Sequence, residues 1–225
     1  INNVKIKMER CMIPKIIHYC WFGRKPLPAD VEKYIKSWKH YCPDYEIIRW
    51  DESNFDVTEN EYCREAYDNK KYAFVADYVR LKVVYDYGGI YMDSDVEVVK
   101  NMDELLPYNV VLGYESDIGF MTGMYGACRN NSLIKIFLDY YNGRKFVMPD
   151  GSFDLTTNVV IITNIIKNKY NYILDGKRNI IDDGVLILPF DYLCAKRLMD
   201  GKIVQTDNTY TIHHFSGSWL PRKDK

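Results

Sequence analysis

Residues 76–96 read A-D-Y-V-R-L-K-V-V-Y-D-Y-G-G-I-Y-M-D-S-D-V, and this stretch decides the fold. It begins inside a predicted helix over 71–87 that is apolar on nearly every side, so most of its circumference must be buried. Gly88 and Gly89 predict the end of the helix, because glycine readily adopts the left-handed backbone of a C-cap. A predicted strand over 90–92 follows, and two aspartates come directly after it.

The segments around this stretch predict an α/β protein. Strands are expected over 15–21 and 45–50, and between them a helix for which Asp30 is the expected N-cap. A β–α–β opening is the signature of an α/β layer architecture. The other elements expected from the pattern are helices over 60–69, 132–141 and 156–169, and strands over 96–99, 110–115, 120–127, 185–188 and 209–215.

Composition excludes two classes of protein. Of the 225 residues, 47% are hydrophobic and 15% aromatic, which indicates a packed globular protein rather than a disordered one. The formal net charge is −1, and Lys and Arg do not cluster, so the footprint of a nucleic-acid-binding protein is missing. An anionic ligand must therefore be held locally, by a metal ion or by a few basic groups.

Cysteine usage and hydropathy give expectations about location. The six cysteines show no C-x-x-C spacing and follow no secretory signal, so we expect reduced thiols in a cytoplasmic protein. No apolar stretch approaches the length of a transmembrane segment, while peripheral attachment at the inner face of the cell membrane stays open. Because Met12-Ile13-Pro14 resembles a natural start, we expect one domain over 12–225 and an N-terminal extension over 1–11.

Asp93 and Asp95 are the leading candidates for chemistry. Side chains alternate along an extended segment, so both carboxylates are expected on one side and Ser94 on the other. Two such carboxylates suit Mn²⁺ or Mg²⁺, which can bridge diphosphate oxygens and stabilise a leaving nucleoside diphosphate. A D-x-D arises about once by chance in a chain of this length, so a solvated acidic turn explains the motif alone. Its place after an apolar strand, where α/β proteins bind ligands, favours a site.

Asp77 and Arg80 are two charged residues within the apolar helix. They are three positions apart and share a face. Charges in such a helix cost free energy unless they are paired or face a polar cavity. An internal ion pair is one interpretation. In the other, Asp77 accepts hydrogen bonds from sugar hydroxyls and Arg80 donates to sugar or phosphate oxygens.

The pattern D-x-x-R, then G-G-x-Y-x-D-x-D, resembles the glycosyltransferases with a DXD-containing sugar-binding region. These include bacterial capsule and lipopolysaccharide enzymes, yeast α-1,6-mannosyltransferases and animal α-1,4-galactosyltransferases, with the clostridial glucosylating toxins as more distant relatives. The opening I-P-K-I-I-H-Y-C-W-F-G (13–23) and the closing Y-T-I-H-H-F-S-G-S-W (210–219) also resemble this family, while the likeness is looser over 100–205. The resemblance implies a GT-A fold, a Rossmann-like mixed central sheet flanked by helices.

The resemblance also implies roles for individual residues. Asp95 would be the principal metal ligand, and Asp93 would contact ribose, metal or both. Asp77 and Arg80 would bind the donor sugar. The other implied donor and nucleotide contacts are Trp21 beside the base, Tyr91 lining the nucleotide site, Asn158 near the donor sugar, and Ser218 and Trp219 in a segment that closes over the phosphates.

His213 and His214 are alternatives for a further metal ligand. Adjacent residues of a strand point to opposite faces, so only one of them is expected to enter the site. Neutral imidazole is a good ligand for Mn²⁺. Relatives carry histidine more consistently at the first position, which favours His213, with His214 as the alternative. A packed core histidine is an equally good interpretation of either residue.

The function implied by the resemblance is a retaining hexosyltransferase that uses a nucleotide-diphosphate sugar. A glycan or glycolipid acceptor in bacterial capsule or lipopolysaccharide biosynthesis is expected, and Trp21 with its short loop favours a UDP-linked donor. No carboxylate is marked as a nucleophile, so we expect attack from the leaving-group face rather than a covalent glycosyl-enzyme. Glu115, Asp117 and Asp182 are acids for an acceptor cleft, with nothing to distinguish them.

Two other classes of protein use similar residues. A metal-dependent phosphatase or phosphomutase also carries D-x-D after an apolar strand, usually the first one, with Thr or Val two residues after the second Asp. Here Glu97 occupies that place, and the motif comes late in the chain. A non-catalytic sugar-binding module would need aromatic and polar groups but no site for a metal and a diphosphate. The sequence leaves the acceptor, the linkage and the oligomeric state open.

Overall fold

The computed structural model describes residues 11–216 of the chain. The extension expected over 1–11 lies outside them apart from Cys11, as do Ser218 and Trp219. The strands are β1 (Ile16–Cys20), β2 (Glu46–Trp50), β3 (Gly89–Met92), β4 (Val96–Val98), β5 (Val110–Ser116), β6 (Gly119–Phe120), β7 (Met124–Ala127), β8 (Asn179–Ile181), β9 (Val185–Leu188) and β10 (Thr211–His213). The α-helices are α1 (Ala29–Tyr41), α2 (Glu61–Asp68), α3 (Tyr72–Tyr87), α4 (Ser132–Asp139), α5 (Asn158–Tyr170) and α6 (Phe190–Leu193), with 3-10 turns at Val57–Glu59, Asp103–Leu105 and Asp182–Gly184.

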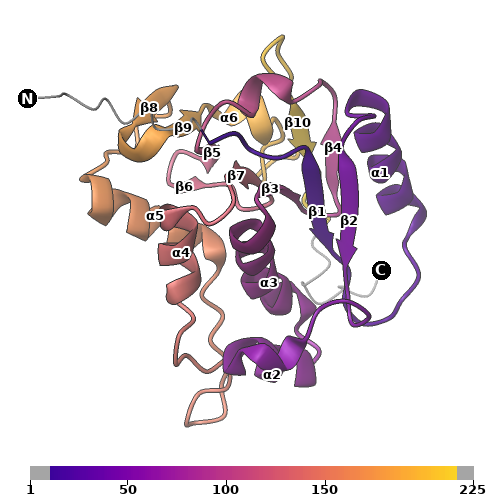
Figure 1. The fold of residues 1–225 in the computed structure, drawn as a ribbon, viewed down its shortest axis with the longest axis vertical. Helices are drawn as coiled ribbons and strands as arrows, with labels where there is room; N and C mark the ends of the chain where they lie inside the picture. Colours follow the sequence, from indigo (N-terminus) through magenta and orange to yellow (C-terminus); the bar gives the residue numbers. More distant parts are fainter. Residues whose placement is uncertain (1–10, 217–225) are drawn as a thin grey trace, which may run out of the picture.

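A mixed sheet forms the centre of the molecule, with strand order β2-β1-β3-β7-β5-β9-β8 and β6 paired to β5 (Figure 1). Strand β1 runs parallel to β2 and β3, and β5 runs parallel to β9. Strand β7 is antiparallel to both β3 and β5, which makes the sheet mixed. Strands β4 and β10 leave this sheet and pair with each other in a two-stranded antiparallel sheet.

Hydrophobic side chains fill both faces of the central sheet. Buried residues of α2, α3, α4 and α5 form one core cluster, and Trp38 of α1 and Leu193 of α6 belong to the other. Strand β3 supplies both, with Tyr91 in the first cluster and Ile90 and Met92 in the second, as alternation along a strand requires. Figure 1 shows α1 and α3 on opposite sides of β1. The expected α/β sandwich of helices around a sheet is therefore confirmed.

Helix α3 is buried along most of its length, as its sequence predicts. It ends at Gly88, which has φ +68, and a Cβ atom there would come within 2.6 Å of the Arg129 backbone nitrogen. The next residue, Gly89, has φ +109, and a Cβ atom there would come within 2.7 Å of the Ile16 carbonyl oxygen. Glycine is thus required at both positions, by positive φ and by close backbone approach. The ψ of Gly88 is −177, so the expected left-handed helical cap is an extended kink instead.

Two further expectations were wrong. Helix α1 starts at Ala29 with Pro28 as its N-cap, and Asp30 lies in the first turn without a capping hydrogen bond. The acidic side chain there interacts favourably with the positive end of the helix instead. The strand expected over 120–127 is broken into β6 and β7, because Phe120 pairs with Tyr114 of β5 whereas Gly126 pairs with Val111, and the extra residues between them leave the ladder.

Cysteines and helix lengths agree with the expectations drawn from the sequence. All six cysteines lie within the described residues, and each is a free thiol. Within 11–216, none of the helices combines the length and the hydropathy needed to cross a bilayer.

Candidate active site

Asp93, Ser94 and Asp95 form a turn between β3 and β4. The Val96 N–H donates to the Asp93 carbonyl at 3.0 Å, so the expectation of an extended segment was wrong. The chain turns here because β4 leaves the central sheet to pair with β10. The two carboxylates converge nevertheless: one oxygen from each lies within 4.8 Å of the other and of a His213 ring nitrogen.

Strand β10 brings His213 to this turn. Its register with β4 pairs His213 with Val96, next to Asp95. His213 is buried, and its Nε2 lies 3.2 Å from Asp95 Oδ1. The His214 ring points elsewhere: its Nε2 is 2.8 Å from Glu97 Oε2, and its ring stacks on Tyr34. The two histidines thus face opposite ways, and His213 is the one that meets the aspartates.

The donor set at this point fits a divalent cation. Two carboxylates and an imidazole are suitable ligands for Mn²⁺ or Mg²⁺, with the imidazole favouring the transition metal. Among the described residues, His213 Nδ1 is buried and has no hydrogen-bond partner. A buried ring nitrogen without a partner costs free energy, and a ligand at this cluster would remove that cost. Asp93, Asp95 and His213 could therefore hold the ion.

Asp95 and His213 form a charged pair in the described structure. Burial lowers the pKa of His213, but the hydrogen bond to Asp95 and its charge outweigh burial and raise that pKa to about 10. Burial raises the pKa of Asp95, yet the His213 hydrogen bond and the Ser216 N–H bring it down to about 2. A metal ion binds neutral imidazole, so it must displace the His213 proton.

Arg80 connects the buried helix to the aspartate turn. Its Nη2 lies 3.2 Å from Asp77 Oδ1 and 3.2 Å from Asp93 Oδ1, and its Nη1 donates to the Thr122 carbonyl at 2.8 Å. The internal Asp77–Arg80 ion pair weighed from the sequence is therefore present, and Asp93 extends it into the candidate site. Burial raises the pKa of Asp77 to about 6, although the Arg80 charge opposes that shift.

Tyr91 is hydrogen-bonded to Asp93. Its hydroxyl donates to Asp93 Oδ1 at 2.9 Å, and the Arg80 guanidinium lies 4.7 Å from the centre of its ring. Only 1% of the Tyr91 surface is exposed. Tyr91 therefore reaches the candidate site through Asp93, whose carboxylate both Tyr91 and Arg80 contact, and its expected contact with the nucleotide stays a prediction.

Asn158 lies at the first position of α5 and joins that helix to α3. Its Nδ2 donates to the Asp77 carbonyl at 2.8 Å, and its Oδ1 accepts from the Tyr141 hydroxyl at 2.6 Å. The side chain is 1% exposed. The structure thus places Asn158 beside the predicted sugar-binding helix. It adds Tyr141, which no local sequence pattern marked.

Trp21 follows β1 at the edge of the sheet where the aspartate turn also lies. Strands β1 and β3 are parallel, so their carboxyl ends meet at one edge, where α/β proteins bind ligands. The Trp21 indole Nε1 donates to the Lys25 carbonyl at 2.7 Å, and this bond closes the loop. The ring is half-buried and packs against the core cluster that contains Trp38.

Two residues near the aspartates were missed or left unranked by the sequence. The Gly123 carbonyl accepts from the Asp93 N–H at 2.7 Å, and a Cβ there would lie 2.9 Å from both Asp93 Oδ2 and His213 Cε1. Glu115 occupies a β-bulge between β5 and β6. Burial raises its pKa, and His213, Asp93 and Arg80 are the charged groups that act on it. The bulge marks Glu115 as a candidate site residue, because β-bulges often turn a side chain towards a functional site.

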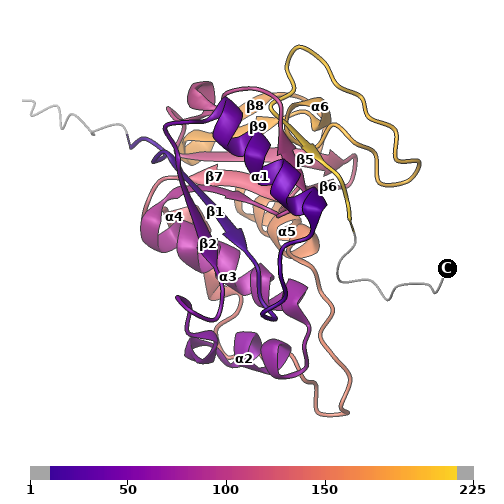
Figure 2. The same cartoon turned by 90° about the vertical axis from the view of Figure 1, so that its right-hand side faces the viewer.

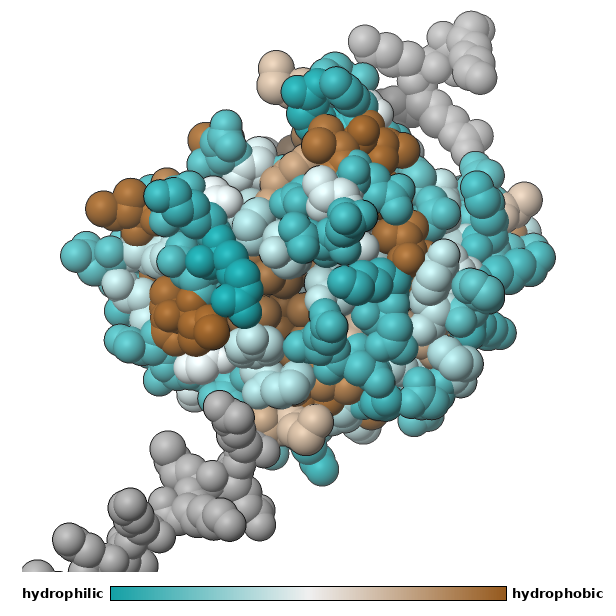
Figure 3. Space-filling view, turned by 90° about the horizontal axis from the view of Figure 1, so that it is seen from above, coloured by the Kyte–Doolittle hydropathy of each residue, from teal (hydrophilic) through white to brown (hydrophobic). Residues whose placement is uncertain are grey.

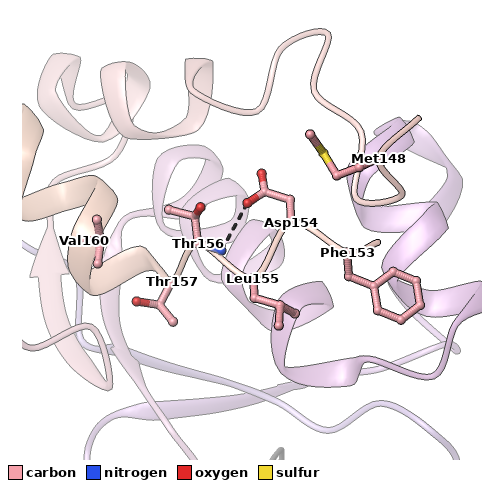
Figure 4. Close-up of a pocket in the computed structure, with 7 residues that line it drawn as sticks. All are labelled: Met148, Phe153, Asp154, Leu155, Thr156, Thr157 and Val160. Carbon is pink, nitrogen blue, oxygen red and sulfur yellow. Dashed lines mark hydrogen bonds between the residues drawn. The ribbon is translucent and has the colours of Figure 1, made fainter. Parts of the chain in front are cut away.

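An open pocket of about 600 Å³ lies beside the start of α5 (Figure 4). Asp154 accepts from the Thr156 N–H at 3.1 Å, which shapes the loop that forms its floor. Thr157 and Val160, on either side of Asn158 in the chain, both line the pocket, so it adjoins the predicted sugar-binding region rather than the aspartate turn. Its lining residues are Met148, Phe153, Asp154, Leu155, Thr156, Thr157 and Val160.

The chain is similar in sequence to known glycosyltransferases. Residues 28–112 match the family model described as glycosyltransferase sugar-binding region containing DXD motif. Inositol phosphoceramide mannosyltransferase 3 of Schizosaccharomyces pombe is 35% identical over 137 residues, which are 59% of this chain and 38% of that protein. Mannosyl phosphorylinositol ceramide synthase SUR1 of Saccharomyces cerevisiae is 30% identical over 124 residues, 52% of this chain and 31% of that protein. The chain thus spans only about a third of the length of each of these relatives.

Among solved structures, the PaToxG glycosyltransferase is similar with a TM-score of 0.52 and 19% sequence identity. The similarity covers 71% of this chain and 70% of that one. At this identity the likeness concerns the fold, and it confirms the expected GT-A architecture.

Proposed function

We propose that the protein is a metal-dependent, retaining hexosyltransferase, because residues 28–112 match the family model of the glycosyltransferase sugar-binding region containing DXD motif. It takes the hexosyl group from a nucleotide-diphosphate sugar and transfers it to a glycan or glycolipid. The observation that carries the proposal is the convergence of Asp93, Asp95 and His213 within 4.8 Å.

Each side chain of the candidate site has a proposed role that follows from its position. A divalent ion held by Asp93, Asp95 and His213 would neutralise the diphosphate of the donor as it leaves. Arg80 holds Asp93 in place through the 3.2 Å ion pair, while Asp77 and Asn158 form the adjoining wall of the sugar subsite. Trp21, at the same edge of the sheet, presents an aromatic face to the base.

The stereochemical proposal is retention by attack from the leaving-group face. Asp77 is bound to Arg80, so its carboxylate is not available as a nucleophile. Glu115 is the carboxylate beside the site for which no hydrogen bond or ion pair occurs within 11–216. A glycosyl adduct trapped on Glu115 would therefore contradict same-face attack and establish a covalent intermediate.

Donor and acceptor are proposed at different levels of detail. Trp21 and its short loop support a uridine diphosphate donor, with Mn²⁺ as the ion. Two relatives are named as mannosyltransferases, which makes GDP-mannose the competing donor. Their names also give a ceramide-linked acceptor, whereas bacterial members of the family supply a capsule or lipopolysaccharide chain. Each of these acceptors is carried on a lipid, or grows on one.

Slow donor hydrolysis tests the proposal without knowledge of the acceptor. The purified protein with Mn²⁺ is offered UDP-glucose, UDP-galactose, UDP-N-acetylglucosamine and GDP-mannose, and the nucleoside diphosphate released is measured. We expect release from one donor class, its loss on chelation, and its loss in Asp95→Asn. The matched control is Asp182→Asn, because the structure places this exposed acid between β8 and β9, with β8 at the edge of the sheet and β3 near its middle. Equal release by Asp95→Asn and the unchanged protein would contradict the assignment.

A further inference from the structure

The chain between α6 and β10 forms a hairpin over residues 195–204, called here the tip hairpin. Its arms pair at Lys196 and Ile203, and the Val204 N–H donates to the Ala195 carbonyl at 2.7 Å. Figure 2 shows this gold segment projecting from the body of the molecule, away from the helices that cover the sheet. The segment is thus a structured projection rather than a loop lying on the surface.

The end of the tip hairpin exposes large apolar side chains. Leu198 is 66% exposed and Met199 is fully exposed, and Ile203 and Val204 continue the apolar surface along the returning arm at 46% and 37%. Figure 3 looks down on this end of the molecule and shows hydrophobic side chains beside hydrophilic ones where the hairpin extends. Several large apolar side chains exposed on one projection indicate a surface that contacts something other than water.

The same hairpin is basic. It contains Lys196, Arg197 and Lys202 against one acid, Asp200, so it carries a formal charge of +2 within a chain whose net charge is −1. Arg197 and Asp200 pair across the turn with Nη2–Oδ2 at 2.5 Å. Long basic side chains beside apolar ones can keep their charges at a polar boundary while their stems contact hydrocarbon.

We propose that the tip hairpin inserts Leu198 and Met199 into the surface of an anionic lipid bilayer. Lys202, which is exposed, would then lie at the level of the lipid phosphates, which attract basic groups near the surface. A bilayer fits the projection better than a protein partner does, because a stable protein interface buries roughly 800 Å² on each side. A few inserted apolar side chains plus complementary charge are sufficient for reversible binding to a bilayer.

The hairpin is connected directly to the candidate active site. The His213 N–H donates to the Cys194 carbonyl at 2.9 Å, one residue before the hairpin, and Lys196 Nζ donates to the His214 carbonyl at 2.8 Å. Membrane contact would therefore hold the site close to a lipid-borne acceptor. That consequence rests on the proposed function, whereas the membrane contact itself does not.

Vesicle binding tests the proposal without donor, metal or acceptor. The protein is sedimented with vesicles of phosphatidylcholine mixed with phosphatidylglycerol and with vesicles of phosphatidylcholine alone. We expect binding to the mixed vesicles and a loss of roughly tenfold or more in partitioning for L198S/M199S. Lys202→Gln should weaken binding to mixed vesicles by about fivefold. The matched control is I173S/I180S, which removes two apolar side chains that are 81% and 56% exposed elsewhere.

Several outcomes would overturn the proposal. They are failure of the unchanged protein to bind mixed vesicles, equal binding by L198S/M199S, and equal loss of binding by the control I173S/I180S. Unfolding midpoints of all variants show whether each remains folded. A dimer in vesicle-free solution that L198S/M199S dissociates would also overturn it, because the hairpin would then contact a second copy of this chain. Donor hydrolysis is measured in parallel, so loss of vesicle binding with hydrolysis intact separates this proposal from the proposed function.

Discussion

Arg80 and Asp93 form an ion pair at 3.2 Å that joins helix α3 to the turn after β3. Arg80 is 5% exposed, and it also holds Asp77 at 3.2 Å. A buried guanidinium between two carboxylates is stable only as a complete network, because any unpaired member keeps its desolvation cost. The orientation of a predicted metal ligand is thereby coupled to the packing of the most buried helix in the fold.

Replacing Arg80 should cost both stability and activity. In Arg80→Met the carboxylates of Asp77 and Asp93 lose their partner, and breaking a buried pair costs roughly 3–5 kcal/mol. We expect a decrease of about 3 kcal/mol in the free energy of unfolding, measured in urea, and loss of donor hydrolysis. Arg64→Met is the control, since Arg64 makes exposed ion pairs only, and it should change stability by about 0.5 kcal/mol or less. Similar effects of the two substitutions would contradict the network.

Gly123 should be intolerant of a methyl group. The added Cβ of Gly123→Ala would lie 2.9 Å from Asp93 Oδ2 and from His213 Cε1, so the two predicted ligands must move. Misplacing reacting groups by about 1 Å can cost roughly 100-fold in rate, and we expect a loss of that order in donor hydrolysis. Gly126→Ala adds the same methyl group against Ile90 and Ile13, away from the site. Unchanged hydrolysis in Gly123→Ala would show that the cluster is not used.

Tyr141 should matter through Asn158. Tyr141→Phe removes the hydroxyl that donates to Asn158 Oδ1 at 2.6 Å and leaves a buried acceptor unpaired. The expected cost is about 1–3 kcal/mol of stability, with a higher KM for the donor than for the unchanged protein. Tyr140→Phe removes a hydroxyl from the neighbouring, partly exposed residue and serves as the control. An unaltered KM with reduced stability would limit Tyr141 to a structural role.

His18 should make stability fall in mild acid. It is buried, its Nε2 lies 2.8 Å from the Gly88 carbonyl, and its Nδ1 accepts from the Trp50 indole at 3.1 Å. Burial lowers the pKa of His18 from 6.5 to about 4. Between these values the unfolded chain binds a proton that the folded protein does not, so stability falls as pH falls from 6.5 towards 4. The full loss is about 3 kcal/mol.

Urea unfolding at a series of pH values checks the His18 prediction. The unchanged protein is compared with His18→Gln, which cannot titrate in this range. The difference between the two curves should shrink by about 3 kcal/mol between pH 7 and 4. Using the difference cancels other groups, including Asp77, whose raised pKa acts in the opposite direction. A constant difference across the range would contradict a neutral, buried His18.

Local sequence signals predicted the elements that local physics controls. The buried helix α3, the glycines that end it and strand β3 follow from apolar patterning and from the freedom of glycine in φ. The two histidines face opposite ways, as alternation along a strand predicts, whereas the preference for His213 came from the family resemblance. The GT-A fold, inferred from a resemblance that began with these motifs, agrees with the PaToxG glycosyltransferase.

Features set by distant segments could not be predicted in this way. The Asp93–Asp95 turn depends on the pairing of β4 with β10, which lies at the other end of the chain. The break between β6 and β7 depends on where each of these strands pairs with β5. Tyr141 and Gly123 reach the site only through tertiary packing, so their own neighbours in sequence carry no signal. Ser218 and Trp219 lie outside the described residues, and their roles stay predictions.

The most direct test of the central claim is the thermal unfolding midpoint of the protein with Mn²⁺ and UDP, with Mn²⁺ and GDP, and with each component alone. A ligand that binds only the folded state raises the midpoint. The proposed site predicts a larger rise with Mn²⁺ and one diphosphate together than with either alone, and its loss in Asp95→Asn but not in Asp182→Asn. A rise that needs no metal, or one that Asp95→Asn retains, would contradict the assignment of Asp93, Asp95 and His213 as the centre that holds the donor.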